Sequence, residues 1–111
     1  MKLGTLEIHR GEKKSGYLKV KGCGLELPVT VIRGEGKRTA LVTAGIHSAE
    51  YVGIQAAVEL AQELCPEQVK GTVIIVPLVN VSGFAHRTMS MVYEDGKNLN
   101  REFPGAAEGT A

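Results

Sequence analysis

Two residues with the chemistry of metal ligands, His47 and Glu50, lie where one kind of sequence pattern gives way to another. Residues 41–46 are apolar or small and predict a buried strand that ends in a tight turn, and a helical pattern begins near Ser48. A strand end and a helix start can aim two side chains at one point. Because a catalytic zinc ion takes histidine and carboxylate ligands, we predict that His47 and Glu50 bind a metal.

The His-x-x-Glu spacing has an alternative explanation without any metal. A packed or capping histidine, followed by an acid that favours a helix start, produces the same four residues. Such a short pattern is common, so taken alone it favours this alternative. The position of His47 after an apolar strand favours the metal site, since α/β proteins build sites at the carboxyl ends of strands.

A second group of polar residues lies in residues 95–105, which read DGKNLNREFPG. Arg101 presents a planar fork of donors that suits a carboxylate, and Asn100 can add an amide donor. The alternative is a turn, a buried Leu99 and a solvated or salt-bridged Arg101, because exposed arginines are common. Residues 80–105 form a long polar and glycine-containing loop, the kind of segment in which ligand sites are built.

The first 38 residues predict β-hairpins. We expect strands over residues 1–10, 17–20 and 25–31, with a polar turn over residues 10–16. Pro28 interrupts the third strand and indicates an edge or a bulge.

Residues 39–79 predict a strand, a helix and a second strand. The two strand segments, residues 39–46 and 72–79, look buried on both faces. Ser48 is the predicted N-cap of the helix and Pro66 ends it. Apolar residues recur between them at helical spacing, at Gly53, Ala57, Leu60, Ala61 and Leu64. This order predicts an α/β fold with a parallel strand pair, and because one helix cannot cover both faces, we expect the chain to self-associate.

The composition fits one soluble domain of 111 residues with a net charge of +1. The basic cluster Lys13-Lys14 is short, so nothing favours nucleic acid as a partner. No apolar run approaches the roughly 20 residues of a membrane span, and the N-terminus lacks a signal-peptide pattern, so we expect no membrane association and a cytoplasmic protein. Cys23 and Cys65 do not form a Cys-x-x-Cys pair, and we expect both to be reduced.

Residues 45–50 (Gly-x-His-x-x-Glu) and residues 98–105 (Asn-Leu-Asn-Arg-x-Phe-Pro-Gly), in this order, closely resemble the succinylglutamate desuccinylase/aspartoacylase family of the zinc carboxypeptidase clan. Ser48 stands where the family usually has a second glycine. The resemblance implies part of a three-layer α/β/α zinc-carboxypeptidase-like (phosphorylase/hydrolase-like) mixed-sheet domain. Residues 1–38 would be its β-hairpin region and residues 39–111 the start of its α/β core, with the C-terminal part missing.

The resemblance also implies roles for single residues. His47 and Glu50 match two ligands of one zinc ion, and Asn100 and Arg101 match the pair that holds the substrate carboxylate and polarises the scissile carbonyl. Arg87 is a further candidate for substrate binding, with Met89 as the alternative at that family position. Family members hydrolyse the amide bond of N-acyl amino acids or related small molecules with a zinc-activated water.

A third zinc-binding histidine and a general-base glutamate are expected beyond Ala111. The 111-residue chain alone is therefore expected to be inactive, and to pair with the missing C-terminal part or with itself. His86 and His9 are possible substitutes for the third ligand, but a polar loop histidine and a surface histidine explain them better. The spacing of the remaining acids, Glu94, Asp95 and Glu102, gives no reason to assign a base.

Two other classes of function stay open. The chain is either part of an enzyme or a non-catalytic α/β unit that acts as an interaction or assembly piece. A nucleotide-binding domain is disfavoured, because residues 44–49 match neither the G-x-G-x-x-G pattern nor a Walker loop.

Overall fold

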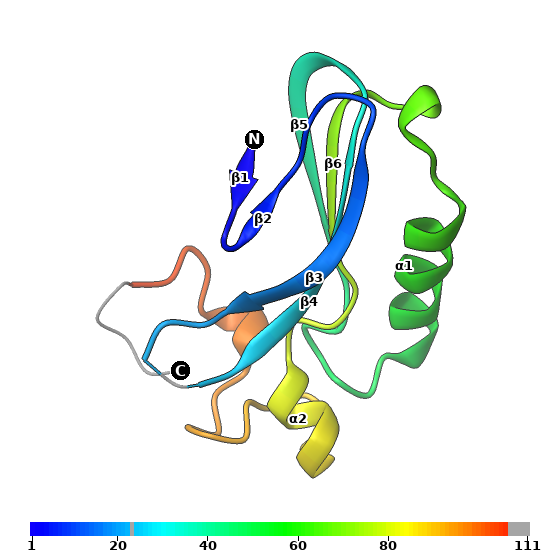
Figure 1. Cartoon of the computed structure of the whole chain (residues 1–111). Coiled ribbons are helices and arrows are strands. Elements are labelled where there is room, and N and C mark those ends of the chain that lie inside the picture. Colours follow the sequence, from blue (N-terminus) through cyan, green and yellow to red (C-terminus); the bar gives the residue numbers. More distant parts are fainter. Residues whose placement is uncertain (23, 107–111) are drawn as a thin grey trace.

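The computed structural model describes residues 1–22 and 24–106, and it has a mixed α/β fold (Figure 1). The strands are β1 (Lys2–Leu3), β2 (Leu6–Glu7), β3 (Lys13–Lys19), β4 (Glu26–Arg33), β5 (Glu35–Thr43) and β6 (Lys70–Val76). The helices are α1 (Tyr51–Glu63) and α2 (Val81–His86), with short 3-10 turns η1 (Pro66–Gln68) and η2 (Leu99–Arg101). The predicted α/β class is confirmed.

The main sheet has four strands in the order β3-β4-β6-β5. Strands β3, β4 and β6 pair antiparallel, whereas β5 and β6 pair parallel, with Leu41 opposite Ile74. The predicted parallel pair is therefore confirmed. Strand β6 lies inside the sheet, between β4 and β5, and its Ile75 is fully buried.

Strand β5 differs from the prediction, because it lies at an edge of the sheet and is mostly exposed. Leu41 keeps 65% of its surface exposed. Burial on both faces was the wrong prediction for this strand in the described chain, since β6 is its one strand partner there. The apolar residues at the end of β5 indicate that this strand is suited to burial, but they do not indicate which part of a protein covers it.

The N-terminal region forms two hairpins with boundaries that differ from the prediction. Residues 1–10 do not make one strand, because the chain reverses between β1 and β2 at Gly4, whose φ of +57° favours glycine. Lys13 already belongs to β3, where a turn was predicted. Pro28 pairs with β3, but β6 joins β4 only from Thr30 onward, so Pro28 lies on a locally open edge as predicted.

Two apolar clusters cover opposite faces of the sheet. The cluster on the hairpin side contains Ile8, Val29, Val31 and Val76, and the cluster under α1 contains Ile32, Ala57, Val69 and Ile75. Each fully buried valine or isoleucine stabilises the fold by roughly 1.5–3 kcal/mol. In α1 only part of the predicted stripe faces inward, since Gly53 and Leu60 are exposed.

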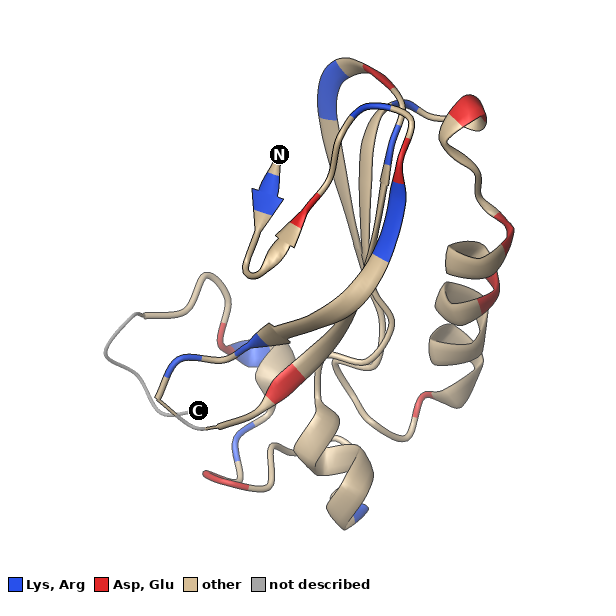
Figure 2. Ribbon diagram, viewed as in Figure 1, with Lys and Arg blue, Asp and Glu red and all other residues tan. Residues whose placement is uncertain are grey.

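Acidic and basic residues are interspersed over the fold (Figure 2). Cys65 is exposed and carries a free thiol, and Cys23 lies outside the described residues. Over residues 1–22 and 24–106, no helix combines the length and the apolar character needed to cross a membrane.

Lys13 connects the N-terminal hairpin to the end of α1. Its ammonium group donates hydrogen bonds to the carbonyl oxygens of Gln62 (3.0 Å) and Leu64 (2.9 Å). The last carbonyls of a helix have no partner within the helix and carry partial negative charge. Lys13 therefore caps α1 from a strand 49 residues away.

We predict that Lys13→Met lowers the free energy of unfolding by about 1 kcal/mol, because it removes the cation and both donors from this helix end. The expected fall in Tm is roughly 4–8 °C in thermal denaturation followed by circular dichroism. Lys19→Met is the matched control, since Lys19 lies exposed on the same strand. Equal Tm values for the two variants would contradict the capping role.

Candidate metal and carboxylate site

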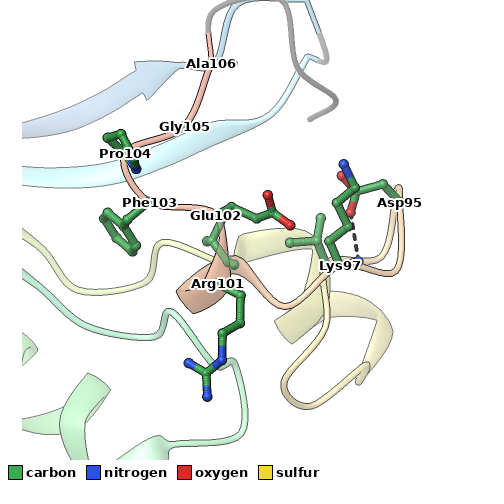
Figure 3. Close-up of a pocket in the computed structure, with 10 residues that line it drawn as sticks. Asp95, Lys97, Arg101, Glu102, Phe103, Pro104, Gly105 and Ala106 are labelled. Atoms are coloured by element: carbon green, nitrogen blue, oxygen red, sulfur yellow. Dashed lines mark hydrogen bonds between the residues drawn. The ribbon is translucent and has the colours of Figure 1, made fainter.

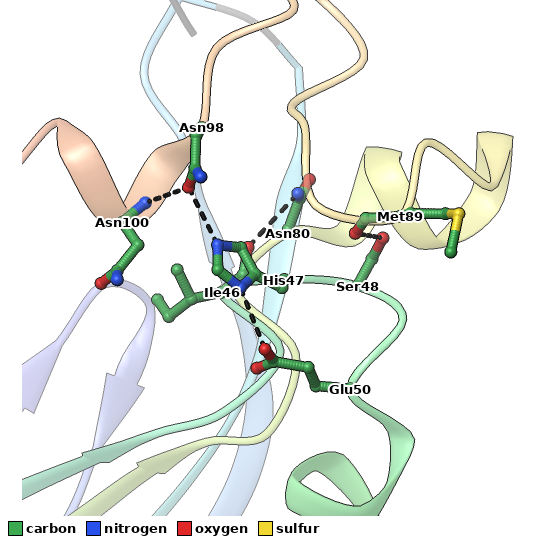
Figure 4. Close-up of polar contacts among 8 residues, drawn as sticks. All are labelled: Ile46, His47, Ser48, Glu50, Asn80, Met89, Asn98 and Asn100. Atoms are coloured by element: carbon green, nitrogen blue, oxygen red, sulfur yellow. Dashed lines mark hydrogen bonds and ion pairs between the residues drawn. The ribbon is translucent and has the colours of Figure 1, made fainter.

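His47 and Glu50 meet in the turn that joins β5 to α1. Gly45 has a φ of +66°, and a Cβ there would lie 2.7 Å from a methyl carbon of Leu78, so the turn requires glycine. The Glu50 amide then donates to the His47 carbonyl at 3.1 Å. This turn brings His47 Nδ1 to 3.0 Å from Glu50 Oε1 (Figure 4).

Ser48 does not cap the helix, contrary to the prediction. Glu50 occupies the N-cap position of α1, without a side-chain capping bond. Ser48 is only 2% exposed, and its hydroxyl donates to the carbonyl oxygen of Met89 at 2.6 Å. A capping side chain accepts a hydrogen bond from the helix, whereas this one donates to a distant loop.

Asn98 brings the second polar group to the histidine. Its Oδ1 lies 2.9 Å from His47 Nε2 and also accepts the backbone N–H of Asn100 at 3.1 Å (Figure 4). Asn98 was not among the predicted site residues. Its position in the family-like Asn-Leu-Asn-Arg run was the available signal, but its target, His47, lies 51 residues away.

The charges around His47 have both signs. The pKa of His47 is raised, first by the hydrogen bond with Asn98 and then by the hydrogen bond and negative charge of Glu50. Partial burial and the positive charge of Arg101 act in the opposite direction. The structure thus brings Arg101 near enough to His47 for their charges to interact, and Asn100 lies beside it in η2.

Residues 95–105 carry Asn100 and Arg101, the pair predicted to clamp a substrate carboxylate, and form the clamp segment. A cavity of about 600 Å³ borders this segment (Figure 3). Arg101, Lys97, Leu99, Phe103 and Pro104 contribute to its lining. Its size falls within the range of small-molecule pockets. Of the two predicted clamp residues, Arg101 lines the cavity and Asn100 does not.

Asn80 holds the loop after β6 against the His47 turn. Asn80 is 3% exposed, and its amide nitrogen donates to the carbonyl oxygens of Met91 (3.1 Å) and Ile46 (3.4 Å). Its Oδ1 accepts the amide of Gly83, which caps α2. The sequence predicts only that a loop begins at Asn80, because its partners Ile46 and Met91 lie in other segments of the chain.

The other candidates lie outside this cluster. Arg87 is exposed at the C-terminal end of α2, with a left-handed backbone (φ 57°). The ring of His86 stacks on Tyr93, with centroids 3.7 Å apart, and His9 uses its backbone N–H to bind Glu12. Within residues 1–22 and 24–106, no three histidine, cysteine or acidic side chains gather closely enough to hold a metal, so neither histidine completes the site there.

Comparison with known proteins matches most of this chain to one family. The model of the succinylglutamate desuccinylase/aspartoacylase catalytic domain matches residues 36–111. The chain is 49% identical to N-alpha-acetyl-L-2,4-diaminobutyric acid deacetylase of Halomonas elongata, covering 96% of this chain and 33% of that protein.

Two solved structures extend this likeness to the fold. The product-bound ectoine utilization protein EutE (DoeB) of Ruegeria pomeroyi is 34% identical with a TM-score of 0.81, over 96% of this chain and 35% of the other. An aspartoacylase family protein of Mesorhizobium loti is 38% identical with a TM-score of 0.78, over the same shares.

The mixed sheet and these matches define the class: the chain matches part of an α/β catalytic domain. The chain belongs to the succinylglutamate desuccinylase/aspartoacylase family, which confirms the resemblance found in the sequence. It spans about a third of the length of the relatives it matches.

We predict that Ser48→Ala loosens the loop over residues 87–93, because it removes the hydroxyl that holds Met89 next to the His47 turn. The loss of one such hydrogen bond should cost about 1 kcal/mol. Faster tryptic cleavage after Arg87, measured by mass spectrometry, is the expected result. Ser90→Ala is the control on the same loop, and an identical cleavage rate in both variants would show that Ser48 does not hold it.

Proposed function

We propose that the chain carries two metal ligands and the carboxylate clamp of a zinc-dependent hydrolase. Its reaction would be cleavage of the amide bond in an N-acyl amino acid or a related small molecule. The observation that carries the proposal is the 3.0 Å approach of His47 Nδ1 to Glu50 Oε1, at the end of β5 and within the electrostatic reach of Arg101.

The donor set fits one zinc ion in part. An imidazole nitrogen and a carboxylate oxygen are common zinc ligands, and here they converge on one point. When bound, a zinc ion supplies polarisation of a carbonyl and a lowered pKa for water. With two converging ligands in the described residues, we expect weak zinc binding and little or no catalysis by this chain alone. The third ligand and the general base stay predicted beyond Ala111.

The clamp residues support a carboxylate-bearing substrate. Arg101 can bind a carboxylate through two parallel hydrogen bonds, and Asn100 can add an amide donor. Arg87 stays a candidate for the same task. The name of the Halomonas elongata relative specifies an N-acetylated diamino acid, which supports an N-acyl amino acid as the substrate class here. The three-layer α/β/α arrangement, in which α1 would form part of one layer, belongs to this proposal.

We predict that the metal-free chain binds one zinc ion weakly in isothermal titration calorimetry and that His47→Ala abolishes the binding. Removal of the imidazole leaves Glu50 as a single weak ligand. His86→Ala is the matched control and should bind as the unmodified chain does, because the His86 ring is stacked on Tyr93.

Equal zinc affinity of the unmodified chain and of His47→Ala would show that His47 is not a ligand of the bound zinc. Absence of binding in all three proteins would overturn the two-ligand site itself.

A second candidate function, assembly through β5, is favoured by the exposure of that strand. An edge strand presents unpaired backbone groups that can pair with another chain. Beside β5, Val42, Gly53, Ala56 and Leu60 contribute to the lining of a groove of about 350 Å³. We infer that β5 and this groove pair with a second copy of the chain or with the C-terminal part of the domain.

We predict that the chain self-associates as its concentration rises and that Leu41→Lys reduces this association, because a lysine on an edge strand opposes strand pairing. Size-exclusion chromatography with light scattering measures the mass directly. Tyr17→Lys is the control, since Tyr17 is 62% exposed on β3 at the opposite edge. A monomer at all concentrations would rule out this assembly.

A further inference from the structure

We propose that Ser82 and Glu94 are positioning residues for the cavity beside Arg101. The hydrogen bond between them fixes the turn over residues 92–97, which lines that cavity. Use of the cavity for a substrate carboxylate rests on the proposed function, whereas the position of the turn follows from hydrogen bonds within this chain.

The start of α2 is tied to the edge of the sheet, which makes Ser82 a fixed point. The backbone amide of Asn80 donates to the carbonyl oxygen of Gly45 at 2.9 Å, in the turn after β5. The side chain of Asn80 accepts the amide of Gly83 and so closes the first turn of α2. Ser82 lies within this turn and is only 6% exposed. It therefore has little freedom to move.

One hydrogen bond leads from this fixed point to the turn that lines the cavity. The Ser82 hydroxyl donates to Glu94 Oε2 at 2.7 Å, across 12 residues of chain. A hydroxyl–carboxylate hydrogen bond of this length is charge-assisted and stronger than a neutral one. Because Glu94 is otherwise exposed, loss of this bond releases its carboxylate to water and frees the segment that carries it.

The turn over residues 92–97 is closed by its own hydrogen bonds, so an anchor at one point positions all of it. The Val92 amide donates to the Lys97 carbonyl and the Gly96 amide to the Val92 carbonyl, both at 2.8 Å. Val92 and Lys97 line the cavity together with Arg101 (Figure 3). The hydrogen bond from α2 therefore also sets where Lys97, a second cation, lies in the cavity.

A neighbouring hydrogen bond from α2 shows why the anchor at Glu94 is needed. The side chain of Asn80 holds the Met91 carbonyl at 3.1 Å, directly before the turn. One anchor at the start of the turn leaves it free to rotate about that point, whereas a second anchor at Glu94 removes this freedom. Loss of the bond between Ser82 and Glu94 should therefore loosen the wall of the cavity without releasing the whole loop.

The test measures amide hydrogen exchange by NMR on the full chain without metal. We expect Glu94→Ala and Ser82→Ala to speed exchange at the Val92 and Gly96 amides about tenfold, because each removes one charge-assisted hydrogen bond. Glu94→Gln is the matched control and should exchange as the unmodified chain does, since its amide oxygen still accepts the Ser82 hydroxyl. The Leu64 amide, which exchanges by fraying of α1, should not change in any variant.

Binding of N-acetylglycine, a probe with one carboxylate and one amide, gives a second measurement. Perturbation of the Arg101 side-chain ¹⁵N–H signals reports occupation of the cavity. We expect both alanine variants to raise the Kd severalfold and Glu94→Gln to leave it unchanged. The double variant Ser82→Ala/Glu94→Ala should raise the Kd no further than either single variant, because both break the same bond.

Unchanged exchange at the turn in both alanine variants would overturn the positioning role. An equal increase in Glu94→Gln would overturn it as well, because the hydrogen bond would then not be the cause. Probe binding with the same Kd in every variant would show that the turn does not shape the cavity. Absence of probe binding in the unmodified chain, together with exchange that depends on the bond, would instead refute the proposed carboxylate clamp and support the fixed turn.

Discussion

The parallel pairing of β5 with β6 is the constraint on which the rest of the site depends. Parallel strands end at the same edge of a sheet, so the turn after β5 and the loop after β6 begin side by side. The hydrogen bonds continue past the strands, from the Ala44 amide to Val76 and from the Val79 amide to Ala44, both at 3.0 Å. The side-chain amide of Asn80, the next residue, donates to the carbonyl oxygen of Ile46 in the turn after β5 and to that of Met91 in the loop after α2. His47 owes its fixed position to this edge.

Local patterns were sufficient for the strand–helix–strand unit and for the His47 and Glu50 pair, because both depend on residues close in sequence. They failed where distant segments decide the outcome. Ser48 has the composition of a helix cap, but the Met89 carbonyl, 41 residues away, takes its hydroxyl. Asn98 reaches His47 only after the fold has closed, and the apolar run of β5 shows its suitability for burial without showing what covers it. Sequence spacing does not reveal such distant partners. The family-like motif of residues 98–105 did include Asn98, but not its contact with His47.

The charges of the cluster divide it into two parts. Glu50 and the Nδ1 side of His47 attract a cation, whereas Arg101 attracts an anion and opposes protonation of the ring. Under the proposed function this division suits a substrate with a carboxylate at one end and an amide carbonyl at the other, because each end meets the charge that binds it. Asn98 is neutral, and its Oδ1 contacts both the His47 ring and the backbone N–H of Asn100, the residue before Arg101.

The exposed edge strand β5 leads into the turn that carries the proposed metal pair, His47 and Glu50. His47 follows the end of β5, and Glu50 lines the groove beside that strand together with Gly53 and Leu60. A chain that fills this groove therefore contacts Glu50, one residue of the proposed metal pair. Occupation of the groove would restrict the Glu50 side chain before a metal binds, and ordering a ligand in advance raises affinity. Under the proposed function, filling of the groove and metal binding should consequently be coupled, because both restrict the same side chain, Glu50.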